Sequence, residues 1–271
     1  MFRDHLSSSL VFASKAFSTV VADDLRVGPI LKNMNQLYSG RDYSTNSDVE
    51  GTITSQNIDS LAKQSMPLCM RQLHDGLKRD HKLKHWGRLQ YGLFLKGAGM
   101  TLEESLLFFQ HEFGKIMSNE QFQKNYSYNI RHMYGKEGKR ASYTPYNCQK
   151  IILGQPPQAG EHHGCPFRHY DVENFSSLLS SKMAISPKHK EEILELKRGK
   201  QYQIACQKYF LALHPGVATM TDVPLGSVGN HPNDWFHASL AYHLSQAKPS
   251  STDTEMKQEN KAARVTPLKT N

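Results

Sequence analysis

The pattern of apolar and polar positions predicts helices through most of the chain between residues 60 and 245. Apolar side chains there recur every three or four residues, as on the buried face of an amphipathic helix. The faces with this spacing are Met66–Leu77, Phe109–Met117 and Tyr202–Leu213. We therefore expect a mainly α domain over residues 60–245.

Residues that start and stop helices support this prediction. Thr101 stands at an N-cap position with Glu104 three residues later, as in a capping box. Ser186 precedes Pro187 at the start of a second periodic segment, and Gly199 follows its end. Strands are expected only as minor short segments, near Tyr126–Arg131 and Cys148–Leu153.

Composition changes outside this region predict three further segments. Residues 1–45 contain an apolar stripe typical of a helix, and residues 46–59 are rich in Gly, Ser, Thr, Asn and Asp, as in a linker. Residues 246–271 lack apolar periodicity and are expected to be a disordered tail. The Ser-rich start resembles a poor transit peptide, but Asp4, Asp23 and Asp24 argue against one. No apolar run reaches the 18 or so residues of a membrane span, so a soluble protein is expected.

The charge distribution predicts a polyanionic partner. The 271 residues carry a net charge of +8 and include 14 histidines, which suits nucleic acid or an anionic membrane surface. Residues 70–140 hold 13 Lys or Arg against 7 acids, so the basic character is concentrated there.

The four cysteines are candidate metal ligands with no familiar spacing. Gaps of 78, 16 and 40 residues separate Cys69, Cys148, Cys165 and Cys206, so no zinc knuckle is present. Without a secretory signal, disulfides are not expected. Unconnected buried thiols, structural zinc and an iron–sulfur cluster all remain open.

Residues 160–169, "GEHHGCPFRH", add two observations about Cys165. Pro166 follows it directly, as a proline follows the last cysteine of bacterial ferredoxin motifs. Nearby His162, His163 and His169 could complete a Cys2His2 zinc site, or be solvated residues or phosphate contacts.

Two segments mix cations with aromatic residues. Residues 79–99, "RDHKLKHWGRLQYGLFLKGAG", combine phosphate-binding side chains with rings that stack on bases when exposed. We expect Phe94 in the core instead. Residues 125–148 place Tyr126, Tyr128 and Asn129 before a glycine-flanked turn, "GKEGKR", that can approach a phosphate closely.

Catalytic motifs are missing from this pattern. The turn lacks Walker A spacing, and the basic region contains no Asp-x-Asp pair for two-metal chemistry. Ser, His and Asp do not occur in a recognisable nucleophile setting. The chain is therefore predicted to bind rather than to catalyse.

Several motifs in order resemble one family. "CMRQLH", "GRLQYGLFLKGAG", "YSYNIRHMYGKEGKR", "YTPYNCQKIIL", "HGCPFRH", "YQIACQKYF" and "NHPNDWF" resemble the C-terminal iron–sulfur domain of eukaryotic and archaeal DNA primase large subunits, from about Gln56 to Phe236. The resemblance implies two helical halves around one [4Fe–4S] cluster, with Cys69, Cys148, Cys165 and Cys206 as ligands.

The resemblance also implies a function. Domains of this family are non-catalytic and hold template DNA and the 5′-triphosphate end of the RNA primer, while primer synthesis is catalysed by the small subunit. The residues implied for nucleic-acid binding are His81, Lys82, Lys84, His85, Arg88, Tyr91, Lys96, Tyr126, Tyr128 and Asn129. Lys82 and Lys84 stand where animal members more often have His and Arg. Lys84 therefore keeps charge without bidentate phosphate geometry.

The expected partners follow from the same resemblance. They are the small catalytic subunit and the DNA polymerase alpha complex, in the nucleus and without a membrane. Residues 1–45 resemble only the end of the preceding helical domain, which predicts a short isoform, a truncated product or a fragment. A zinc-stabilised RNA-binding or interaction module and an electron-transfer protein are the rival hypotheses.

Overall fold

The computed structural model describes residues 2–22, 51–182, 185–220, 223, 225 and 228–247. The chain divides into two compact units, residues 1–40 and 41–271. In the first unit, α1 spans Phe2–Ala22, and large apolar side chains such as Leu10 and Phe12 are exposed on it. The predicted helical character is confirmed over α1. The apolar stripe from Leu25 to Leu37 lies outside the described residues, as does the predicted tail from residue 248.

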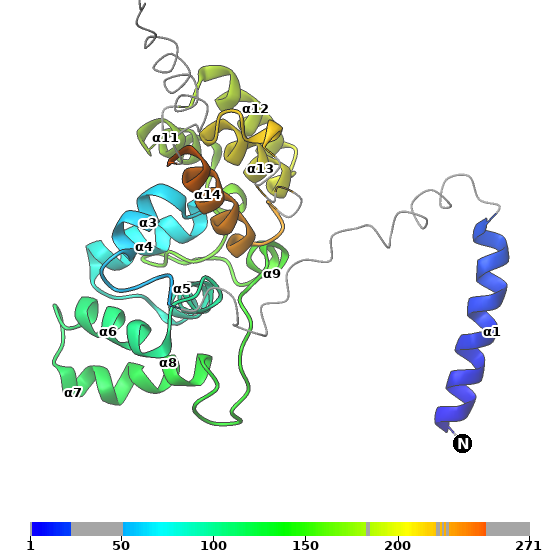
Figure 1. Cartoon of the computed structure of the whole chain (residues 1–271), viewed down its shortest axis with the longest axis horizontal. Helices are drawn as coiled ribbons and strands as arrows, with labels where there is room; N and C mark the ends of the chain where they lie inside the picture. The colour runs from blue at the N-terminus through cyan, green and yellow to red at the C-terminus, as the bar shows by residue number, and fades with distance from the viewer. Residues whose placement is uncertain are drawn as a thin grey trace, which may run out of the picture. The chain divides into compact units, whose positions relative to one another are not determined.

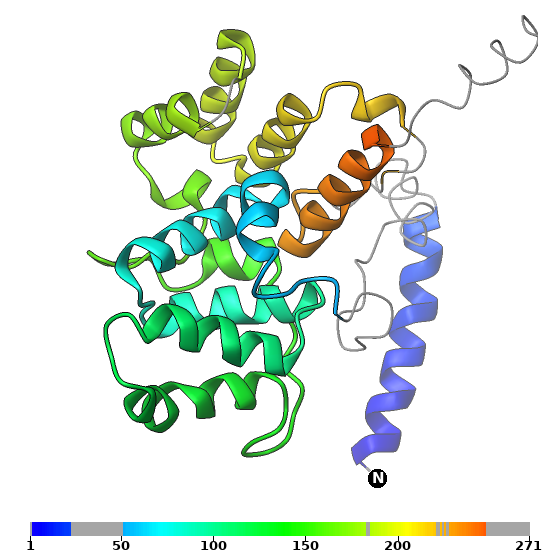
Figure 2. The same cartoon turned by 60° about the vertical axis from the view of Figure 1, so that its left-hand side comes forward.

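The second unit is built from helices (Figures 1 and 2). Its first part contains α3 (Ile58–Ser65), α4 (Leu68–Asp80), α5 (His85–Gly97), α6 (Leu102–Phe113), α7 (Asn119–Phe122), the π-helical turn η1 (Gln123–Ser127), α8 (Tyr128–Met133) and α9 (Cys148–Leu153). Its second part contains α10 (Pro166–His169), α11 (Val172–Lys182), α12 (Pro187–Arg198), α13 (Tyr202–Leu213), the 3₁₀ turn η2 (Val217–Thr219) and α14 (Pro232–Ala247).

Two hydrophobic cores organise these helices. The first gathers buried side chains of α3–α9, including Phe94 and Phe109. The second gathers those of α10–α14, including Phe167 and Phe210. Helices α4 and α14 contribute to both cores, since Leu68 belongs to the second and Phe236 to the first. The cores are therefore joined by shared helices rather than by a hinge segment.

The predicted helix ends agree with the structure, with one difference. Thr101 accepts a hydrogen bond from the backbone N–H of Glu104, and Ser186 caps α12 with Pro187 in its first turn. Gly199 follows α12 as expected. The Glu104 carboxylate, however, accepts from the backbone N–H of Ser55 at 2.6 Å. It fixes a segment 49 residues earlier instead of completing the capping box.

The segment expected as a linker is packed where the structure describes it. Ile53 and Ile58 are fully buried in the first core. The backbone N–H of Gly51 donates to the carbonyl of Gly99, just after α5, at 2.7 Å. Residues 51–59 are therefore attached to the first core at several points.

The expected minor strands are wrong. The structure is helical at both positions and contains no strand among its described residues. The Asn147 side chain accepts from the N–H of Lys150 and starts α9, while a Ser118 capping box starts the helical run that continues through α8. A short apolar run such as Ile151-Ile152 occurs both in strands and in buried helix turns. The capping side chains therefore determine that these segments are helical.

Asn233 connects the cores through a buried hydrogen bond. Its amide on α14 donates to the carbonyl of Phe94 on α5 at 2.8 Å. The Phe94 carbonyl also accepts from the backbone N–H of Ala98 at 2.9 Å. The substitution Asn233→Ala removes the second of its two hydrogen bonds, so we expect a loss of about 0.5–1.5 kcal/mol in the free energy of unfolding. Urea denaturation measures it. Asn125→Ala, on an exposed residue, is the control, and an equal loss there would contradict the assignment.

Candidate functional site

The four cysteines line a single cavity between the two cores. Cys69 lies in the first turn of α4, Cys148 opens α9, Cys165 precedes α10 and Cys206 lies within α13. Cys69 packs against the first core, Cys206 against the second, and Cys165 against both. Ile151, Phe167 and Tyr202 are among the other residues that line the cavity. All four cysteines are free thiols.

Burial and mutual proximity disfavour charge on these sulfurs. Burial raises the pKa of all four thiols, that of Cys165 to about 11. Ionisation of Cys206, Cys69 and Cys165 would raise the pKa of Cys148 further. A cation in the cavity would reverse this preference, because metal-bound thiols are deprotonated. The donor set therefore fits a thiophilic metal group.

The four thiols line the cavity together. Within the described ranges, no three His, Cys, Asp or Glu side chains are placed to hold a single metal ion. Four cysteine thiolates are the usual ligand set of a [4Fe–4S] cluster, which is larger than one ion. The number of cysteines that line the cavity equals the number of ligands of such a cluster.

The backbone around Cys165 is held by polar side chains from both cores. Gln90 on α5 receives the N–H of Gly164 at 2.7 Å and donates to its carbonyl at 3.3 Å, and both bonds are buried. Lys197 on α12 donates to the carbonyls of Phe167 and Tyr170 at the end of α10. The loop that carries Cys165 is thus fixed from two sides.

The three nearby histidines are engaged in other contacts. His162 pairs with Asp80 at 2.7 Å, and His163 bonds the carbonyl of Gln155 at 2.9 Å. His169 accepts from the backbone N–H of Cys165 at 3.1 Å. None of them lines the cysteine cavity. The structure therefore gives no support to a Cys2His2 site and places His169 as a support for the Cys165 backbone.

Four of the ten residues implied for nucleic-acid binding line one small pocket. His85 and Arg88 come from α5, Tyr126 from η1 and Asn129 from α8. The Arg88 guanidinium lies 4.9 Å from the centre of the Tyr126 ring and donates to the carbonyl of Leu83 at 2.7 Å. Burial lowers the pKa of Arg88. Its buried Nε–H has no acceptor among the described residues, so this cation retains a free donor.

A π-helical turn divides the two tyrosines between different environments. Such turns add a residue to the helix, rotate the following side chains and often occur at functional sites. Tyr126 packs edge-on against Phe113 at 4.9 Å, whereas Tyr128 is 46% exposed. Tyr128 stacks with His132 at 6.0 Å, and His132 lies 4.8 Å from the Tyr143 ring. An aromatic surface therefore adjoins the pocket.

The segment between α4 and α5 carries three more of the implied residues. His81 adopts left-handed backbone geometry at φ 53° and contacts Glu112. Lys82 is exposed, and Lys84 donates to the carbonyl of Ala159 in the cysteine loop at 3.2 Å. Their side chains are therefore on the surface next to helix α5.

Two of the implied residues belong to the core. Tyr91 is fully buried, and its hydroxyl lies 2.7 Å from Nδ1 of His74. Lys96 is 3% exposed and donates to Met133, Ser142 and Tyr143, while burial lowers its pKa to about 8. Both side chains are buried and paired within the protein, and nucleic-acid binding by either residue stays a prediction. Lys96 holds the turn that the sequence identified as phosphate-approaching, and Phe94 is buried as expected.

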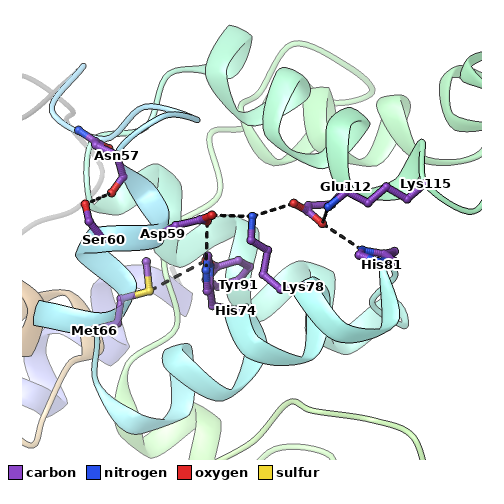
Figure 3. A network of polar contacts seen from close by, with 10 residues as sticks. All are labelled: Asn57, Asp59, Ser60, Met66, His74, Lys78, His81, Tyr91, Glu112 and Lys115. Atoms are coloured by element: carbon purple, nitrogen blue, oxygen red, sulfur yellow. Dashed lines mark hydrogen bonds and ion pairs between the residues drawn. The ribbon is translucent and has the colours of Figure 1, made fainter.

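The supporting residues Gln90, Lys197 and Glu112 were not predicted from the sequence. Each is a polar residue within an amphipathic helix, where the pattern predicts a solvated face. Only the tertiary packing shows that they are buried. Figure 3 shows the polar partners of Glu112. A local sequence signal for them does not exist.

Comparison with known proteins identifies the class of this helical, four-cysteine domain. The family model for the C-terminal domain of the eukaryotic and archaeal DNA primase large subunit matches residues 59–236. The chain is 48% identical over 236 residues to the DNA primase large subunit of Homo sapiens, covering 87% of this chain and 45% of the human protein. It is 42% identical over 240 residues to the probable DNA primase large subunit of Arabidopsis thaliana. That match covers 88% of this chain and 51% of the plant protein.

The chain therefore belongs to the DNA primase large subunit family, and the resemblance inferred from its motifs is confirmed. The chain spans about half the length of the curated relatives it matches. Among the residues that the structure describes, no helix combines the length and apolar character needed to cross a membrane.

The Gln90 contact generates a prediction about the cysteine loop. Gln90→Leu keeps the side chain's size but leaves both backbone groups of Gly164 buried and unpaired. We expect the free energy of unfolding to fall by about 2–4 kcal/mol, measured by urea denaturation. In the control Gln110→Leu, which removes a surface bond to Asn119, a change of about 0.5 kcal/mol or less is expected. Similar losses in both variants would contradict a specific role for Gln90.

Proposed function

We propose that this chain acts as the nucleic-acid-binding part of a non-catalytic DNA primase large subunit. In this role it holds template DNA and the 5′-triphosphate end of the RNA primer during primer initiation. The single observation that carries the proposal is the pocket of His85, Arg88, Tyr126 and Asn129, in which Arg88 retains an unpaired donor. The Arg88 guanidinium carries a positive charge and several N–H donors in a planar arrangement that matches a phosphate group. It lies over a tyrosine ring, and an amide and an imidazole line the same pocket.

The surroundings of the pocket fit a single-stranded or junction substrate. Lys82 and Lys84 lie on the exposed segment before α5, and Lys136, Lys139 and Arg140 are exposed beyond α8. Tyr128 and Tyr143 flank the last three of these cations in the sequence and present partly exposed rings. Cations that follow a phosphate backbone and rings that stack on bases are the usual combination for such ligands.

The proposal includes a [4Fe–4S] cluster held by Cys69, Cys148, Cys165 and Cys206. It is supported by four free thiols that line one cavity, the number of ligands that such a cluster takes. When bound, such a cluster supplies four metal–sulfur bonds that cross-link distant helices. The residues of this chain contribute the fixed loop at Cys165 and the capped start of α9 at Cys148.

The proposed partners follow from the family. The synthesis of the primer would reside in the small catalytic subunit, with assembly into the DNA polymerase alpha complex in the nucleus. This division agrees with the sequence, in which no catalytic motif was recognised.

Metal analysis tests the cluster. We expect the anaerobically purified protein to be brown, with broad absorbance near ~400 nm and with iron and sulfide in equal amounts. Cys165→Ala removes one of four thiolates and should abolish the bound iron, whereas His162→Ala should retain it. Zinc without iron in the unmodified protein would refute the cluster and favour the zinc-stabilised module, whether or not the alanine variant folds.

Binding measurements test the pocket. Arg88→Ala should weaken binding of a 5′-triphosphate primer annealed to template DNA by about ten- to a hundredfold, since a charge-assisted hydrogen bond is worth roughly 1.5–3 kcal/mol. Fluorescence anisotropy at moderate salt measures the dissociation constant. Arg198→Ala removes the same charge from an exposed position on α12 and should have little effect. Equal affinities for Arg88→Ala and the unmodified protein would count against this pocket.

A further inference from the structure

Glu112 is a buried carboxylate that contacts two lysines and a histidine (Figure 3). Its side chain, on α6, has no exposed surface. Lys78 on α4 approaches one oxygen at 2.8 Å, while His81 and Lys115 approach the other at 3.1 and 2.9 Å. Both oxygens of the Glu112 carboxylate are therefore paired.

These partners keep Glu112 ionised. Burial alone would raise its pKa, but hydrogen bonds from Lys78, Lys115 and His81 outweigh burial and lower the pKa to about 2. A buried charge that is so completely paired is costly to disturb, because removal of one partner leaves the other charges uncompensated. The position of each partner is accordingly well defined.

His81 differs from the two lysines in its location. It ends α4 in left-handed geometry and begins the short segment that presents Lys82 and Lys84 before α5. Its ring is 30% exposed, and Nδ1 faces Glu112. Because a carboxylate only accepts hydrogen bonds, Nδ1 must carry the hydrogen of this contact. The second nitrogen, Nε2, is left for another partner.

We propose that Glu112 is a positioning residue for phosphate recognition. It orients the His81 ring so that Nε2 faces a phosphate oxygen of the bound nucleic acid. An imidazole between two anions is held as the doubly protonated cation, which donates from Nδ1 to Glu112 and from Nε2 to the phosphate. This inference rests on the proposed function and adds a residue that touches no nucleic acid itself.

A double-mutant cycle tests the positioning role. Glu112→Gln and His81→Ala should each weaken binding of the 5′-triphosphate primer–template by about tenfold, or roughly 1.4 kcal/mol. The double variant should be no weaker than His81→Ala alone, because Glu112 acts through His81. A matched primer with a 5′-hydroxyl shows whether His81 contacts the 5′-triphosphate or a phosphate of the nucleic-acid backbone. A loss confined to the triphosphate primer assigns the oxygen to the triphosphate, and a loss on both primers assigns it to the backbone.

A control variant and a spectroscopic signal separate positioning from general stabilisation. Lys78→Gln breaks contacts with Glu112 and Asp59 but leaves His81 in place, so its affinity should stay within about twofold of the unmodified protein. Ring ¹⁵N signals of His81 should show both nitrogens protonated in the complex, and this state should be lost in Glu112→Gln. Additive losses in the cycle, or an equal loss in Lys78→Gln, would overturn the proposal.

The Arg88→Ala variant, measured in the same assay, distinguishes this inference from the proposed function. Weaker binding by Arg88→Ala together with unchanged binding by Glu112→Gln rejects only the positioning role. Unchanged binding by both variants rejects the pocket and the positioning role together.

Discussion

Four cysteines from distant parts of the sequence meet at one cavity between the two cores. Cys69 and Cys206 belong to different cores, and Cys165 packs against both. The segments between successive cysteines are long, so the unliganded chain must close large loops before the thiols meet, at an entropic cost that grows slowly with loop length. The shared helices α4 and α14 and the bond from Asn233 to Phe94 already bring these segments together. The protein scaffold therefore accounts for much of the arrangement that a metal group would lock.

Helix α5 transmits this arrangement to the candidate interface. Gln90 on this helix fixes the backbone before Cys165, while His85 and Arg88, a few residues earlier, line the pocket. Lys96, near its end, fixes the turn that follows α8. A single rigid element thus determines both the geometry around the cysteines and the positions of the phosphate-binding candidates.

The sequence predicted the helical class and several helix ends, because caps such as Thr101 and Ser186 act locally. Sequence patterns were insufficient where tertiary packing determines which side chains are buried. The segments expected as strands are helical, since short apolar runs carry no reliable period. Tyr91 and Lys96 have the residue types of a nucleic-acid interface, but composition does not reveal which side of α5 faces the core. The cysteines were identified by motif resemblance, and their shared cavity required the fold.

The attachment of the segment before α3 has a further consequence. Gly51 bonds to the chain just beyond α5, Ile53 is buried, and Ser55 bonds to Glu104. Any polypeptide joined to residue 51 consequently starts from a fixed origin on the first core. The effective concentration of a tethered module depends on the distance from its anchor point to its target. Because residue 51 is held in place, its position enters that distance as a constant.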